Sequence, residues 1–127
     1  MIPVTGHSPE DLLQAGRDLL TRRDLRSRGV WPRAAAHLCR QALEETLETY
    51  WKTRAPGLEA ASMRAQLAAL PAYLEPELAG SVSYVWGALS NACHHHTYEL
   101  APTAQELSLW AETVERLMTA TRKPASS

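Results

Sequence analysis

Long apolar runs are absent from this sequence of 127 residues. No stretch approaches the roughly 18 consecutive apolar residues that a membrane-spanning helix needs. Residues 1–7 also lack the basic and apolar regions of a secretory signal peptide. We therefore expect a cytoplasmic protein with no membrane insertion. With 45% apolar and 21% charged residues, the chain is expected to fold as one globular domain over residues 1–127.

Cysteine is scarce, with only Cys39 and Cys93, and the two lack the short spacing of metal-binding cysteines. We expect buried free thiols in a reducing compartment. Three of the five histidines are consecutive, at 94–96. Consecutive helical residues point about 100° apart, so these three cannot all bind one metal ion. We expect neither a metal site nor a cofactor, and a metal-binding helical protein is only a third alternative.

Strand patterns are also missing, because no segment alternates polar and apolar residues between hairpin turns. Every strong periodicity is helical, and Ser8-Pro9 and the pair Thr103 and Glu106 are typical of helix starts. The expected helices span residues 9–27, 31–54, 59–70, 75–97 and 103–121. We predict an all-α protein, an up-and-down antiparallel four-helix bundle with an extra short helix.

The second expected helix has the strongest amphipathic pattern. Its polar side carries His37, which is therefore expected on the surface and not as a ligand. The same side has Arg40 four residues before Glu44, and Glu48 four residues before Lys52, two spacings that favour ion pairs along a helix.

The fourth expected helix, 75–97, has an apolar stripe that ends with Cys93 and His96. Its other faces carry unusually small residues: Gly80, Ser81, Ser83, Gly87, Ala88 and Ser90. Small side chains let another backbone approach closely, within the bundle or across a dimer interface. We expect a homodimer formed through this helix.

The net charge of −1 conceals an uneven distribution. Six of the thirteen Lys and Arg residues fall within residues 17–33: Arg17, Arg22, Arg23, Arg26, Arg28 and Arg33. A local basic cluster on a nearly neutral protein suits the phosphate backbone of RNA, and Arg22, Arg23, Arg26 and Arg28 are the candidate RNA-binding residues. The alternative is an ordinary solvated helix face.

One short motif stands out near the end of the fourth expected helix: Asn91, then His96 five residues later, then Tyr98. It resembles the Arg-x4-His-x-Tyr motif of HEPN toxins, which are paired with a minimal nucleotidyltransferase antitoxin. In the wider HEPN superfamily the fold is a helical bundle, with the motif at the end of a long helix before the last one. The resemblance covers about residues 31–118, and only the motif is specific.

The resemblance implies a metal-independent endoribonuclease with a cleft built by two protomers. His96 would be the acid and base acting on the ribose 2′-hydroxyl, a role suited to its pKa near neutrality. Tyr98 would be the hydroxyl that the antitoxin modifies with AMP, exposed at the mouth of the same cleft. Asn91 occupies the place of the phosphate-binding arginine and has no charge, which predicts weakened or lost activity. His95 is an alternative base.

Structural roles stay open for two motif residues: His96 could be a histidine at the core edge, and Tyr98 a packing tyrosine. The function predicted first is a HEPN-like RNA-binding domain of a bacterial defence or toxin–antitoxin system. It would have a nucleotidyltransferase antitoxin or a larger protein as partner. The alternative is a non-catalytic helical module for dimerisation or protein interaction.

Overall fold

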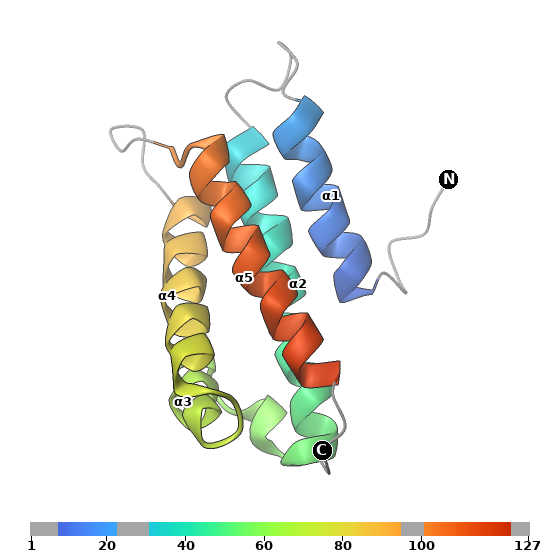
Figure 1. Ribbon diagram of the computed structural model, residues 1–127, viewed down its shortest axis with the longest axis vertical. Coiled ribbons are helices and arrows are strands. Elements are labelled where there is room, and N and C mark those ends of the chain that lie inside the picture. The colour runs from blue at the N-terminus through green and yellow to red at the C-terminus, as the bar shows by residue number, and fades with distance from the viewer. Residues whose placement is uncertain (1–7, 23–30, 95–100, 123–127) are drawn as a thin grey trace.

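The computed structural model describes residues 8–22, 31–94 and 101–122. Four long helices lie side by side and run alternately up and down (Figure 1): α1 (Pro9–Arg22), α2 (Trp31–Arg54), α4 (Pro76–Cys93) and α5 (Ala104–Arg122). Between α2 and α4 the chain forms the short helix α3 (Met63–Ala69), flanked by the 3-10 turns η2 (Leu58–Ala60) and η3 (Leu70–Ala72). These described parts contain no strand, and the predicted all-α bundle with an extra short helix is confirmed.

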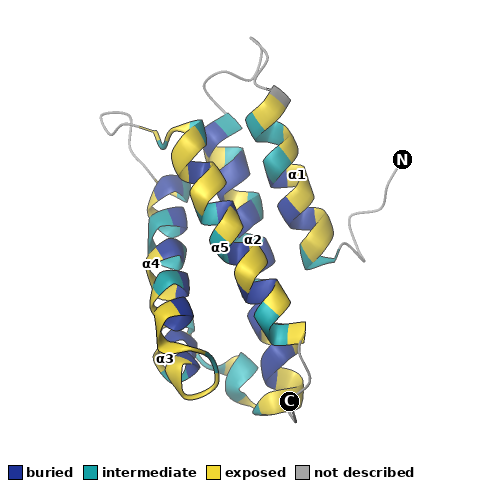
Figure 2. Ribbon diagram, viewed as in Figure 1, coloured by how far each residue is buried: buried dark blue, intermediate teal, exposed yellow. Residues whose placement is uncertain are grey.

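Helix α2 is the centre of the bundle, because it packs against α1, α4 and α5. Its buried stripe ends with Trp51, the largest fully buried side chain. Buried positions on α4 and α5 face the same interior, while exposed positions cover the outside (Figure 2). Each fully buried Leu of this core contributes about 1.5–3 kcal/mol relative to an exposed one, so the expected helical stripes account for the packing.

Gly16 lets α1 approach α2 closely. A Cβ atom at this position would lie 3.2 Å from Cys39 Sγ and 3.4 Å from the Ala35 carbonyl oxygen. Neither the helix backbone nor a buried thiol moves easily, so a larger residue would push the two helices apart. On α1, Leu12, Leu13 and Gly16 are buried, while Leu19 and Leu20 are partly buried against the core.

Helix starts follow the capping signals. The Asp11 backbone N–H donates to Ser8 Oγ over 3.1 Å. At α5 the Glu106 N–H donates to Thr103 Oγ1 over 3.0 Å, and the Thr103 N–H donates to Glu106 Oε1 over 2.9 Å. This reciprocal pair satisfies two backbone donors that the helix itself leaves free, which confirms the predicted start of α5.

Two expected boundaries need revision. Helix α4 ends at Cys93 and not at residue 97, because the His94 backbone has φ −113° and ψ 19°. The region expected as one helix over 59–70 instead begins with η2, and α3 starts only at Met63, where Ser62 caps it by accepting from the Ala65 N–H. Residues 23–27, expected to continue α1, lie outside the described residues.

Within the described parts of the chain, no helix has both the length and the apolar character needed to cross a bilayer.

Candidate functional site

Only the first residue of the predicted motif is described. Asn91 is exposed on the last turn of α4, and the His94 N–H donates to its carbonyl over 3.1 Å and to the Ser90 carbonyl over 3.3 Å. The remaining predicted residues of the motif, His95, His96 and Tyr98, lie outside the described residues. The predicted exposure of Tyr98 therefore stays a prediction.

Asn91 does not share a helix face with Cys93. Two residues along a helix turn the side chain by about 200°, and Cys93 faces α2, where its Sγ lies 3.9 Å from His37 Nδ1. Asn91 therefore points away from α2.

Polar side-chain contacts connect α2 to the C-terminal half of α4. The Trp86 indole N–H donates to Glu44 Oε2 over 2.8 Å, and Arg40 Nε lies 3.5 Å from the same oxygen. Further along, His37 meets Cys93. His37 is exposed, as expected, but its contact with Cys93 was not predicted, since the two residues are 56 positions apart and no sequence signal joins them.

Burial raises the pKa of the Cys93 thiol, and the nearby Arg40 guanidinium only partly opposes this effect. Burial also raises the pKa of the Cys39 thiol to about 11. Both sulfurs are therefore mostly protonated near neutrality, which suits structural thiols and not nucleophiles. Cys39 is buried as expected, whereas Cys93 is only half-buried at the edge of the core.

The predicted RNA-binding arginines fall almost wholly outside the described residues. Arg22 is the last residue of α1, and its side chain is not described; the other three candidates are Arg23, Arg26 and Arg28, which lie beyond the helix. Of the rest of the basic cluster, Arg17 forms an ion pair with Glu115 on α5, with its Nη2 2.8 Å from Oε1. Arg33 is exposed on the first turns of α2.

The helix ends that flank the basic segment and the histidine segment meet at one end of the bundle (Figure 1). Here α1 and α4 finish, at Arg22 and Cys93, and α2 and α5 begin, at Trp31 and Ala104. We call this the histidine end. The up-and-down order of the helices causes this arrangement, since residues 23–30 and 95–100 are both connections made at the same end.

A groove lies between α4 and α5, with a volume of about 680 Å³. Tyr84, on α4, is 69% exposed beside it, and Leu109, on α5, is 56% exposed. Gly80 lines the groove, and a Cβ added at Gly80 or at Gly87 would meet nothing within 4 Å. The α4 surface at Gly80 and Gly87 is therefore open, with room for a side chain at both positions.

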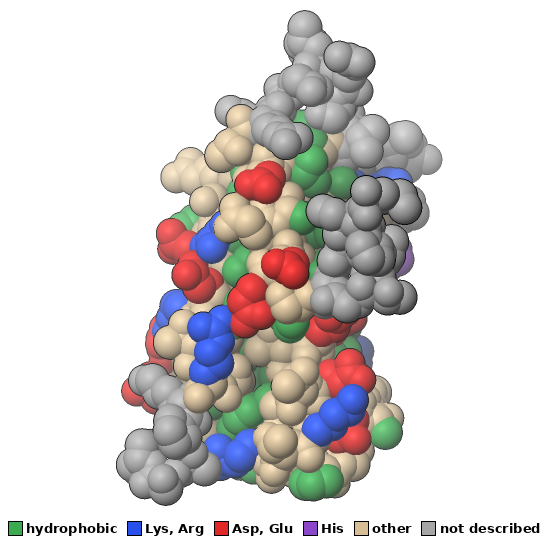
Figure 3. All heavy atoms as spheres, turned by 90° about the vertical axis from the view of Figure 1, so that its right-hand side faces the viewer, with side chains coloured by type: hydrophobic (Ala, Val, Ile, Leu, Met, Phe, Trp, Pro, Cys, Tyr) green, Lys and Arg blue, Asp and Glu red, His purple; other side chains and the backbone are tan. Residues whose placement is uncertain are grey.

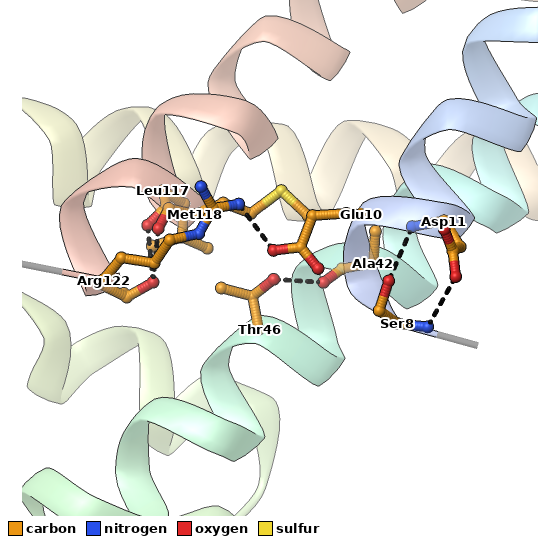
Figure 4. Close-up of polar contacts among 9 residues, drawn as sticks. Ser8, Glu10, Asp11, Ala42, Thr46, Leu117, Met118 and Arg122 are labelled. Atoms are coloured by element: carbon orange, nitrogen blue, oxygen red, sulfur yellow. Dashed lines mark hydrogen bonds and ion pairs between the residues drawn. The ribbon is translucent and has the colours of Figure 1, made fainter. Parts of the chain in front are cut away.

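A second hollow, of about 250 Å³, lies near the opposite end of the bundle from the histidine end, where the first turn of α1 meets α2 and the last turn of α5. We call it the threonine hollow, after the four threonines in its lining: Thr46, Thr49, Thr53 and Thr121. Glu10 and Arg122 form an ion pair beside it (Figure 4). This site was not predicted from the sequence, because its walls come from three helices.

Ion pairs join neighbouring helices on the described surface: Arg17 with Glu115, Arg116 with Glu77 and Arg122 with Glu10. The face in Figure 3 carries acidic and basic side chains next to each other, without a large area of one sign. Within the described ranges, no group of three or more His, Cys, Asp or Glu side chains could hold a metal ion. No known family model, curated protein or solved structure matches this chain.

Proposed function

We propose that this chain is a HEPN-like, cytoplasmic RNA-binding domain of a bacterial defence or toxin–antitoxin system, with weakened metal-independent endoribonuclease activity. The observation that carries the proposal is the common position of two connections. The segment richest in arginine and the segment with the His-x-Tyr sequence both leave the bundle at the histidine end. On this proposal, the two segments would supply the phosphate-binding and proton-transferring side chains near this end of the bundle.

Charge favours RNA at this end. Arg22, Arg23, Arg26 and Arg28 belong to the connection between α1 and α2 or border it, and Arg33 follows on α2. Guanidinium groups bind phosphate oxygens through paired, charge-assisted hydrogen bonds. Such contacts release counterions, so the affinity for RNA is expected to fall as salt concentration rises.

Chemistry at the site would rest on His96, which exchanges protons near neutral pH. Asn91 offers an amide where the family motif has a guanidinium, and it faces away from the α2 side. Removing one contact that stabilises transition-state charge typically slows a reaction by about 10²–10³. Weak cleavage is therefore expected. AMP added to Tyr98 by an antitoxin would place negative charge near the phosphate site and oppose RNA binding.

The test is RNA binding by the full chain, measured by fluorescence anisotropy over a range of salt concentrations. The variant replaces Arg23, Arg26 and Arg28 with Gln. The matched control replaces Lys52, Arg54 and Arg64, which lie away from the histidine end, with Gln. If the three arginines contact phosphates, the magnitude of the slope of log affinity against log salt decreases by about 2 in the first variant, or roughly 0.7 per contact. The control variant keeps the slope of the unchanged protein. Equal effects of both variants, or no binding at low salt, would contradict the proposal.

A second candidate function is a dimerisation module, with α4 at the interface. The exposure of Tyr84 and Leu109 beside an open groove favours it. Large exposed apolar side chains mark interaction sites when they gather on one face. The two functions are compatible, since the HEPN resemblance itself implies a cleft made by two protomers.

A further inference from the structure

Three threonine hydroxyls of the threonine hollow use their protons on backbone carbonyls. The Thr46 hydroxyl donates to the Ala42 carbonyl over 2.8 Å, and the Thr53 hydroxyl donates to the Tyr50 carbonyl over 3.2 Å. The Thr121 hydroxyl faces the carbonyl oxygens of the preceding turn, at 2.9 and 3.1 Å. A hydroxyl has one proton and two lone pairs. A threonine hydroxyl that donates its proton to a backbone carbonyl can therefore only accept a hydrogen bond from a ligand.

Glu10 adds a carboxylate to this acceptor surface. A backbone hydrogen bond, and then the hydrogen bond from Arg122, lower the pKa of Glu10 below its ordinary value. The group is therefore ionised near neutrality. A carboxylate has about four lone-pair positions, and Arg122 Nη2 lies 2.6 Å from only one of its oxygens, Oε2.

The contact of Arg122 with Glu10 indicates which kind of chemical group could bind in the hollow. Its guanidinium, which carries only donors, lies on Glu10 beside the hollow (Figure 4). Both side chains of this pair are more than half exposed, at 59% and 52%. Exposed ion pairs contribute little free energy. A second cation could therefore take the place of Arg122 at small cost.

Apolar surface is available next to these acceptors. Met118, Pro9 and Tyr50 also line the hollow, and the Tyr50 hydroxyl is buried without a hydrogen-bond partner among the described residues. A short carbon chain could lie on this apolar wall while its charged head binds Glu10. The volume of about 250 Å³ limits the ligand to a small molecule.

We propose that the threonine hollow binds a small alkylguanidinium or alkylammonium compound, whose donor-only head binds Glu10 and the threonine oxygens. The ligand competes with Arg122 for the carboxylate. This site lies away from the histidine end and is independent of RNA binding. Because Glu10 belongs to α1 and Arg122 to α5, a ligand that displaces Arg122 breaks the ion pair between these two helices.

The experiment titrates the full chain with butylguanidinium, followed by calorimetry and by NMR shifts of the residues around the hollow. Butylurea is the matched control ligand, since it has nearly the same shape and no charge. Glu10→Gln is expected to weaken butylguanidinium binding about tenfold. Arg122→Gln removes the competitor and is expected to strengthen binding severalfold.

Arg116→Gln serves as the matched control variant, because Arg116 forms a similar exposed pair with Glu77 outside the hollow. It is expected to leave the affinity unchanged. Opposite effects of Glu10→Gln and Arg122→Gln would support the proposal, because a merely structural ion pair would make both variants behave alike. Weaker binding in Arg122→Gln, equal binding of butylurea, or no saturation by about 20 mM ligand would overturn it.

Discussion

The indole N–H of Trp51 donates a 3.1 Å hydrogen bond to the side-chain carbonyl of Gln66, and both residues are buried. Gln66 in turn donates through Nε2 to the Ala61 carbonyl over 2.8 Å. One glutamine thereby satisfies the only polar atom of the largest core side chain and fixes the turn before α3. The α2–α4 connection is held to the core by this pair.

Replacing Gln66 with Leu is expected to destabilise the protein by about 1–3 kcal/mol, because the buried indole N–H and the Ala61 carbonyl lose their partner. Urea denaturation followed by tryptophan fluorescence measures the loss. The control Gln105→Leu, at an exposed position on α5, is expected to change the stability by less than about 0.5 kcal/mol. Equal effects at the two positions would show that the hydrogen bond does not stabilise the core.

Asn91→Arg is expected to raise RNA cleavage by about 10²–10³, because it restores the charge that the family motif has at this position. Cleavage of labelled RNAs without added metal measures the change. Adding His96→Ala should remove the gain, whereas Arg64→Gln, away from the histidine end, should preserve it. An inert Asn91→Arg protein on varied RNAs would leave the nuclease proposal without support.

The substitution Gly87→Leu is expected to prevent dimerisation through α4 without destabilising the fold. Nothing lies within 4 Å of a Cβ at this position, so the bundle should accept the side chain, and the helix should gain up to about 1 kcal/mol from the loss of glycine. A close contact between two α4 helices would be blocked. Sedimentation should then show a monomer with an equal or higher melting temperature. Ala68→Leu, on the exposed side of α3, is the control and should leave a dimer intact.

Thiol labelling should distinguish the two cysteines. Cys39 is buried and its pKa is raised to about 11, so iodoacetamide at pH 8 meets about one thiolate in a thousand. Cys93 is half-buried and should react first, though more slowly than a thiol in an unfolded peptide, because its pKa is also raised. Mass spectrometry should find one modified cysteine in the native protein and two in denaturant. Rapid modification of Cys39 without denaturant would contradict this packing.

Stability should depend on the ionisation of Glu10. Because its pKa is lower in the folded protein, its contribution is present above the ordinary glutamate value of about 4.3 and is lost as the pH falls through the folded value. Glu10→Gln should cost less than about 1 kcal/mol at pH 7, since the pair is exposed. The difference from the wild type should vanish in acid. A double-mutant cycle with Arg122→Gln isolates the pair, and a pH-independent difference would exclude it as the cause.

Contacts between near neighbours on one helix were predictable from the sequence. Arg40 and Glu44, and Glu48 and Lys52, form the expected i,i+4 ion pairs, with N–O distances of 3.5 and 3.4 Å. Such pairs depend only on the 3.6-residue repeat. The buried stripes were predictable for the same reason.

Contacts between helices were not predictable in this way. Periodicity indicates which face of a helix is buried but not which residue of another helix lies opposite. Glu10 and Arg122 are 112 positions apart, and His37 and Cys93 are 56 apart. The end of α4 at Cys93 was also not predicted, because residue 94 is neither a glycine nor a proline, the residues that commonly mark a helix end. The motif therefore begins at Asn91 on the last turn of α4, and His96 and Tyr98 lie outside the described residues.

The ion pair between Glu10 and Arg122 also holds the start of α1 close to the end of α5. The first turn of α1 adjoins the last turn of α5, so a short glycine–serine linker could join Ser8 to Arg122 with little loss of chain entropy. New termini could open at the exposed turn at Gly57. A circular permutant of this kind should build the same bundle with α3 synthesised first. The fold would then depend on which helix faces pack together and not on the order in which the helices are synthesised.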